Sequence, residues 1–157
     1  MTAHVHAERA RVKKLADATA IGIDDALISQ LVERFYGAIR QDDLLGPIFA
    51  AHVVDWTPHL GRMKDFWASV TLESGRFRGN PMIKHIAIGG LGQAHFDRWL
   101  ILWRKTVGTV VAEPAAAHLF CTSAERIAES LLTGIQIRSG GLGALLTPPA
   151  AAEKANI

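Results

Sequence analysis

Residues that start and stop helices divide this sequence into short segments, and within each segment the apolar residues recur every three or four positions. That spacing places the apolar side chains on one face of a helix. The alternating apolar and polar runs that predict strands do not occur in the sequence, and no repeat of fixed period is found. The pattern therefore predicts an all-α protein.

The first clearly signalled helix should begin after Asp24, a good N-cap, with Ile23 and Ile28 placed to form a hydrophobic staple. It should end near residues 41–43, and "LLGPIF" should follow as a turn and a short helical stub. The apolar face of this helix is predicted to comprise Leu27, Leu31, Phe35, Ala38 and Ile39.

Four more helices are expected, and the last of them should end at Gly140-Gly141. Their predicted starts are Thr57-Pro58, Asn80-Pro81, Gln93 and Pro114. Residues 1–22 lack a strong apolar period and are predicted to form an N-terminal arm, partly helical. Residues 141–157 are predicted to be a flexible C-terminal tail. A single domain is therefore expected over residues 23–140.

The charge balance and the cysteine content limit the classes of partner and compartment. Seventeen basic residues against 15 acidic residues leave a net charge of +2, which is too small to hold a nucleic acid. No stretch reaches the roughly 20 apolar residues that a membrane-spanning helix needs. Cys121 is the only cysteine, so an intrachain disulfide cannot form. We expect a cytoplasmic protein that binds neither nucleic acid nor membrane.

Most of the seven histidines have simple explanations. His4, His6 and His118 are expected at the surface. His52 and His95 lie beside loops or helix starts and are expected to make ordinary hydrogen bonds. None of them shows the i, i+4 or His-Glu-x-x-His spacing of a helical zinc site. A zinc protein is therefore not predicted.

His85 lies in "NPMIKHIAIGG", a predicted helix of barely two turns with Asn-Pro before it and Gly-Gly after it. Its neighbours Met82, Ile86 and Ile88 are apolar. The imidazole should therefore face an apolar space in a fixed orientation, as a metal ligand requires. The same pattern also fits a core histidine bonded to a backbone carbonyl. These residues alone leave both interpretations open.

Three polar groups are predicted on otherwise apolar helix faces. His59 begins a face that Met63 and Phe66 continue, while Tyr36 and Trp99 lie on two other helices. A phenol or an indole N–H needs a hydrogen-bond partner when it is buried. Together the three groups suggest an apolar cavity that holds a hydrogen-bond acceptor. The alternative is that Tyr36 and Trp99 bond to each other or to water.

Four segments, taken in order, resemble the group III truncated haemoglobins of the two-over-two globin family. They are "RFYGAIRQDDLLGPIF", "DWTPHLGRMKDFW", "GRFRGNPMIKH" and "HFDRWLILW", and the resemblance runs from about Ile23 to Arg138. It implies a helical sandwich around haem b. A short helix between breakers can be set against a haem independently of the longer helices, and so can aim one imidazole at the iron.

The resemblance also implies roles for single residues. His85 resembles the proximal ligand of the iron, and Tyr36, His59 and Trp99 resemble the distal residues that stabilise a bound ligand. The further residues expected to contact the haem are Phe35, Phe49, Met63, Phe66, Ile86 and Trp103.

Four cations are expected to pair with the two haem propionates, with simple solvation as the alternative. They are Arg62, Arg76, Arg78 and Lys84. Phe77 stands where the family has a tyrosine at least as often, which removes one hydroxyl from this edge of the expected site.

The function that the resemblance implies is binding of O2, CO or NO at the iron, with distal donors that favour tight O2 binding. Tight binding suits oxidation of NO or peroxidase-like chemistry, with electrons from a separate, unidentified reductase. The alternatives are O2 storage or transport, and a ligand sensor without turnover. His59 is expected to donate to the ligand, to gate the pocket or to bind the iron itself. The sequence does not predict the oligomeric state.

Overall fold

The fold is that of a computed structural model, which describes residues 2–138. Every regular element among these residues is a helix, which confirms the predicted all-α class. The predicted helix end at Gly140-Gly141 and the predicted tail lie outside the described residues. The helices are α1 (Thr2–Ala20), α2 (Asp25–Gln41), α3 (Gly46–His52), α4 (Trp56–Leu72), α5 (Pro81–Ile88), α6 (Gln93–Val110) and α7 (Pro114–Gln136).

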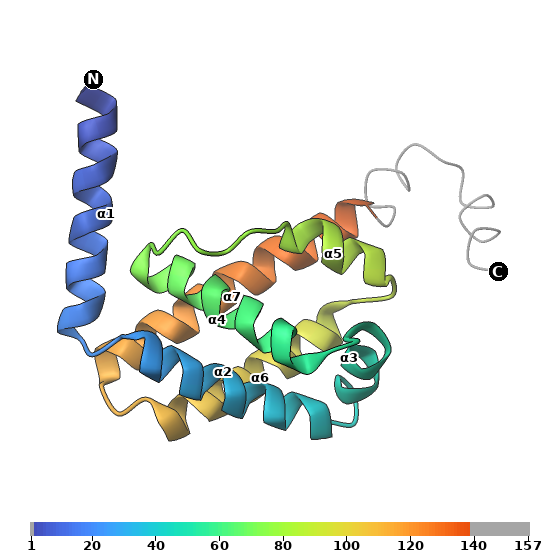
Figure 1. The fold of residues 1–157 in the computed structure, drawn as a ribbon. Helices are drawn as coiled ribbons and strands as arrows, with labels where there is room; N and C mark the ends of the chain where they lie inside the picture. The colour runs from blue at the N-terminus through green and yellow to red at the C-terminus, as the bar shows by residue number, and fades with distance from the viewer. Residues whose placement is uncertain (1, 139–157) are drawn as a thin grey trace.

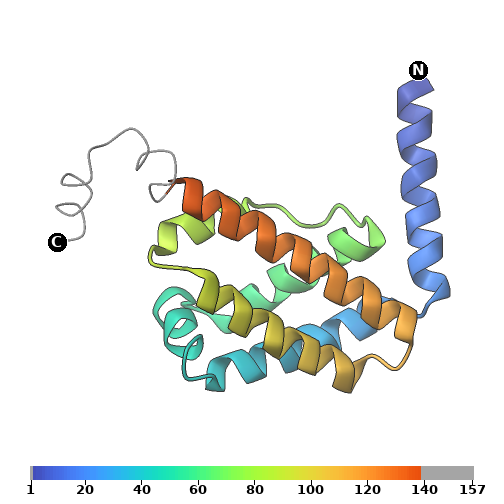
Figure 2. The ribbon, with the colours of Figure 1, turned by 180° about the vertical axis from the view of Figure 1, so that it is seen from behind.

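Four long helices form two layers. In Figure 1, α2 and α4 lie in front of α6 and α7, and the opposite view in Figure 2 has α6 and α7 in front. α2 packs against both α4 and α6, and α6 packs along α7. The short helix α5 lies beside the C-terminal part of α7 (Figures 1 and 2). This arrangement confirms the predicted helical sandwich.

Local capping signals set the ends of α2 and α5. The Leu27 N–H donates to the Asp24 carboxylate (2.8 Å), and the Ile83 N–H donates to the Asn80 side chain (3.2 Å). Gly89, with a φ of 72°, ends α5 in a backbone conformation that favours glycine. The structure therefore confirms the predicted caps of both helices.

The start of α4 differs from the prediction. Asp55, and not Thr57, is the N-cap, and its carboxylate accepts a hydrogen bond from the Thr57 N–H (3.1 Å). Pro58 consequently lies later in the first turn instead of at its first position. A proline is tolerated there because the first N–H groups of a helix have no acceptor within it.

The buried face of α2 also differs in part from the prediction. Ala38 is exposed, whereas Val32 and Tyr36 are buried together with Leu31, Phe35 and Ile39. Alanine has little apolar surface to bury, so the larger side chains decide which stripe of the helix faces the core.

Aromatic rings join the two layers in the core. Trp67 of α4 stacks on Trp103 of α6, with ring centroids 4.3 Å apart. The indole N–H of Trp103 donates to the carbonyl of Phe120 in α7 (3.1 Å). Trp103 is thus fully buried with its single donor satisfied.

α1 stands outside the sandwich in both views (Figures 1 and 2). Ala18 is its one buried residue, and the helix is tied to the end of α4 by an ion pair of Lys14 with Glu73 (2.8 Å). The predicted arm is therefore helical over most of its length. Among residues 2–138, no helix is long and apolar enough to cross a membrane.

Candidate functional site

Residues of α2 to α7 line a cavity of about 420 Å³. This volume lies within the usual range of sites for small molecules and cofactors. Tyr36, His59 and His85 are among the polar residues of its wall. Its apolar residues include Leu45, Ile48, Phe49, Val53, Met63, Phe66, Trp67, Phe77, Ile88, Leu91, Phe96, Trp99, Ile127 and Leu131. The polar groups predicted from separate helices are thus brought to one largely apolar space.

His85 reaches the cavity from α5 with one ring nitrogen already engaged. Its Nδ1 lies 2.6 Å from the carbonyl oxygen of Pro81, one turn earlier. Because a carbonyl can only accept, Nδ1 carries a proton, and in the neutral form of the ring the lone pair is on Nε2. The same bond fixes the orientation of the ring, as such bonds do for metal-bound histidines. The two interpretations left open by the sequence are therefore compatible: a carbonyl-bonded His85 can still offer Nε2 to a metal.

His59, on α4, is held between aromatic rings. Its imidazole lies edge-on to Tyr36 (5.2 Å between centroids) and to Trp56 (5.4 Å). Its Nε2 is buried and has no hydrogen-bond partner among the described residues. Burial, and after it the positive charges of Arg62 and Lys84, lower the pKa of His59 to about 4. The ring is therefore neutral near pH 7, and its buried Nε2 is free to bond to a molecule in the cavity.

Tyr36 brings a phenol to the same cavity from α2. The residue is 5% exposed, and its ring packs against Phe49 with centroids 5.7 Å apart. Burial raises the pKa of its hydroxyl well above the ordinary value. The hydroxyl therefore keeps its proton at physiological pH and is available as a hydrogen-bond donor.

Trp99 reaches the cavity from α6, and its orientation is fixed by the core. Its ring lies parallel to that of Trp103 (5.9 Å between centroids) and edge-on to Phe35 (5.5 Å). The indole N–H can only donate. Trp99 and Tyr36 thus provide donors from two helices of opposite layers.

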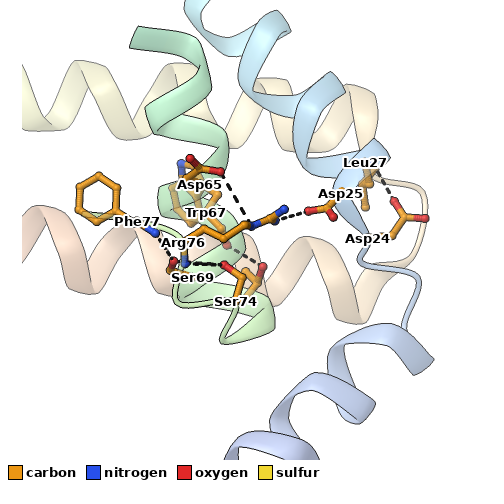
Figure 3. Close-up of polar contacts among 10 residues, drawn as sticks. Asp24, Asp25, Leu27, Asp65, Trp67, Ser69, Ser74, Arg76 and Phe77 are labelled. Atoms are coloured by element: carbon orange, nitrogen blue, oxygen red, sulfur yellow. Dashed lines mark hydrogen bonds and ion pairs between the residues drawn. The ribbon is translucent and has the colours of Figure 1, made fainter. Parts of the chain in front are cut away.

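Three of the four predicted propionate partners lie in the cavity wall, namely Arg62, Arg78 and Lys84. Arg76 does not. In Figure 3 its guanidinium extends to Asp25 (2.5 Å) and Asp65 (3.9 Å), on the side opposite the Phe77 ring. These ion pairs join the loop that carries Arg76 to α2 and α4, and a contact of Arg76 with a propionate stays a prediction.

Comparison with known proteins identifies the family. The curated protein named group 3 truncated hemoglobin, from Campylobacter jejuni, is 33% identical over 95 residues, which cover 58% of this chain and 75% of that protein. The chain belongs to the group 3 truncated haemoglobins. The crystal structure of a group III truncated hemoglobin from the same organism superposes with a TM-score of 0.68 at 28% identity, over 72% of this chain and 91% of that one. No family model matches the sequence.

Membership of this globin family implies haem as the cofactor and small diatomic molecules as ligands. Of the residues predicted to contact the haem, Phe49, Met63 and Phe66 line the cavity. Their contact with haem stays a prediction.

Three other residues predicted to contact the haem are placed elsewhere in this truncated haemoglobin. Among the described residues, the cavity wall does not include Phe35, Ile86 or Trp103. Phe35 and Trp103 are fully buried and meet edge-on, with centroids 4.9 Å apart. Ile86 packs against the apolar cluster of α6 and α7. Each of these side chains lies on a face that another helix covers, and Phe35 and Trp103 pack against Trp99. Their contact with haem stays a prediction.

The structure also brings to the cavity residues that the sequence did not single out. His52 and His95 make the expected ordinary hydrogen bonds, to the Ile48 carbonyl (2.9 Å) and from the Gly92 N–H (3.0 Å), but both also line the cavity. Ile127 and Leu131 of α7 lie in the wall as well. Ile127 and Leu131 lie four residues apart, which places both on one face of α7. This spacing does not show whether the face packs against a cavity or against another helix, because both environments favour the same residue types.

Proposed function

We propose that this truncated haemoglobin holds haem b in the cavity, with Nε2 of His85 as the protein ligand of the iron. The observation that carries the proposal is the bond between His85 Nδ1 and the Pro81 carbonyl. It selects the neutral tautomer whose lone pair is on Nε2, and it fixes the ring at the wall of the cavity.

The other residues of the cavity fit the same cofactor. Its apolar wall suits the porphyrin, and the side chains of Arg62, Arg78 and Lys84 suit the two propionates. When bound, haem supplies an iron centre that binds diatomic ligands and exchanges electrons. The buried Nε2 of His59, which has no hydrogen-bond partner within residues 2–138, can bond to a ligand in the cavity.

Tyr36, Trp99 and His59 act as the distal group in this proposal. Tyr36 keeps its proton, Trp99 can only donate, and neutral His59 can carry its proton on Nε2. In a dry cavity each donor should stabilise a partly negative ligand by roughly 1–3 kcal/mol. Three such donors favour tight binding of O2 over rapid delivery.

We further propose redox chemistry on the bound ligand, namely oxidation of NO to nitrate or reduction of peroxide. A separate reductase chain would supply the electrons. The single cysteine, Cys121, is consistent with a reducing cytoplasm as the place of this reaction. Rapid mixing of the O2-bound protein with NO, followed by reduction with candidate partners, tests the activity: repeated turnover supports it, and a single stoichiometric reaction contradicts it.

The experiment that tests the iron ligand is His85→Gly with visible spectra of the ferric and ferrous protein. We expect loss of the normal coordination and its recovery on addition of free imidazole. His52→Gly is the matched control, because His52 also lines the cavity and also bonds a carbonyl four residues earlier. Unchanged coordination in His85→Gly would show that the assignment is wrong.

The same spectra decide among the roles of His59. If His59 binds the iron, the wild-type protein is low-spin without added ligand and His59→Ala is not. If wild type and His59→Ala give the same spectrum, His59 does not bind the iron, and donation to the ligand or gating of the pocket remains its role.

A further inference from the structure

Gly134 of α7 forms a notch that the side chain of Met82, on α5, occupies. A Cβ atom built on Gly134 would overlap the Met82 sulfur and would lie 2.5 Å from its methyl carbon. Real Cβ atoms do not approach other atoms so closely. At Gly37, Gly61 and Gly108, which also lie within helices, an added Cβ would meet no atom of another described element within 4 Å. Glycine at position 134 therefore leaves the space that the Met82 side chain occupies.

The contact between Met82 and Gly134 matters most for the position of α5. α5, which is described in full, is eight residues long and has no fully buried residue. The loop before it has no regular structure, and the two glycines after it have φ values of 72° and 73°. The position of α5 consequently depends on its packing against α7, where Met82 and Ile86 contact the cluster that contains Leu131 and Ile135.

We propose that Gly134 and Met82 are positioning residues that set where His85 meets the haem iron. Met82 lies three residues before His85 on the same short helix. The fit of Met82 in the notch therefore sets both the distance of α5 from α7 and the rotation of α5 about its own axis. This inference rests on the proposed role of His85 as the iron ligand. It adds that the strength of that bond is set from α7, by a residue that does not line the cavity.

The physical consequence is specific to added volume at position 134. A methyl group there displaces the sulfur and methyl carbon of Met82, which are the flexible end of the side chain. Met82 must then leave the notch by taking another rotamer, or α5 must shift on α7. Either change alters the packing of α5 on α7 at Met82, and we expect the His85 ring to move with α5. Methionine adapts easily to irregular gaps, which explains why it is the residue that fills this notch.

The test compares Gly134→Ala with Gly108→Ala. Each glycine lies two residues before the end of its helix, and each substitution gives the same gain in helix propensity, but only the first meets Met82. The readouts are the iron–histidine stretching band of the ferrous haem protein and the rate of haem transfer to excess apomyoglobin. We expect Gly134→Ala to shift the band and speed haem loss, and Gly108→Ala to leave both unchanged.

Met82→Ala is a second arm, because it removes the occupant of the notch without adding volume. It should also shift the band. In the double variant the shift should be smaller than the sum of the two single shifts, since both changes act on one contact. The same band in wild type, Gly134→Ala and Met82→Ala overturns the proposal, as do strictly additive shifts.

The role of His85 is tested separately by His85→Gly. A band that persists in His85→Gly overturns the proposed iron ligand. A band that disappears there but is unmoved in Gly134→Ala and Met82→Ala overturns only the positioning role.

Discussion

At the scale of single residues, the three proposed distal groups, on Tyr36, His59 and Trp99, should all keep one protonation state near neutral pH. Burial keeps the proton on Tyr36, while burial and nearby cations keep His59 neutral down to a pKa of about 4. Trp99 cannot lose its proton at any relevant pH. The hydrogen bonding of this wall should therefore stay constant across the physiological range.

Removing a distal donor should speed the release of O2. Tyr36→Phe deletes only the hydroxyl and keeps the ring that packs against Phe35 and Phe49. A loss of roughly 1–3 kcal/mol corresponds to about a tenfold to hundredfold faster dissociation. The same range is expected for Trp99→Phe. The rates are measured by rapid mixing, and an unchanged rate in both variants would contradict the donor roles.

His59 should make stability depend on pH in the acid range. Its pKa falls from an ordinary value of 6.5 to about 4 on folding, so between these values the unfolded chain takes up a proton that the folded protein does not. Stability should therefore be unaffected above pH 6.5 and decline as the pH falls toward 4. The urea midpoint at pH 7 and at pH 5 should differ more in wild type than in His59→Phe. Equal differences would show that His59 is not held neutral by folding.

At the scale of elements, α5 is the helix whose formation depends most on local signals. It begins at the Asn80 cap and ends at Gly89-Gly90, and it is too short to be stable on its own. The helices α2, α4, α6 and α7 are 17 to 23 residues long and bury apolar faces against one another, so a single cap matters less to them.

Loss of the cap of α5 should therefore affect haem retention. Asn80→Ala removes the acceptor of the Ile83 N–H and should cost about 1 kcal/mol of unfolding free energy. Asp24→Ala, the control, removes the equivalent cap of α2 at the bond to Leu27 and should cost a similar amount. Only Asn80→Ala should speed haem transfer to apomyoglobin. Equal transfer rates in the two variants would contradict the dependence of haem binding on α5.

At the scale of the whole molecule, the sandwich and α1 are joined by few contacts. α1 buries Ala18 near its end, and before that it meets the rest of the chain at Glu73, through Arg11 and Lys14. Both ion-pair partners are partly exposed, and such pairs contribute roughly 0–1 kcal/mol.

Deletion of residues 2–16 should consequently change the free energy of unfolding by less than about 1 kcal/mol and leave the haem spectrum unchanged. Urea unfolding and visible spectra of the shortened protein provide the measurement. A larger loss of stability, or loss of haem, would show that the domain does not begin at residue 23.

The sequence predicted correctly those features that depend on neighbours along the chain. The caps at Asp24 and Asn80 and the glycine end of α5 are of this kind, because a side chain and the backbone it caps are at most three residues apart. The prediction for the start of α4 was wrong because Asp55 and Thr57 are both residue types that cap helices. Pro58 is compatible with either cap, since it lies within the first turn in both cases. The sequence by itself thus determined the helical class and most helix borders, and its resemblance to a family singled out His85 among the histidines that line the cavity.

Only the tertiary structure decided which of several equivalent residues reach the cavity. Trp99 and Trp103 lie one turn apart on the same face of α6, yet stacking on Trp67 and a bond to Phe120 hold Trp103 in the core while Trp99 lines the cavity. Arg76 and Arg78 lie in one loop, yet the carboxylates of Asp25 and Asp65 hold only Arg76. The physical reason is the same in both cases: the partners that decide come from distant parts of the chain, and a local pattern carries no information about them.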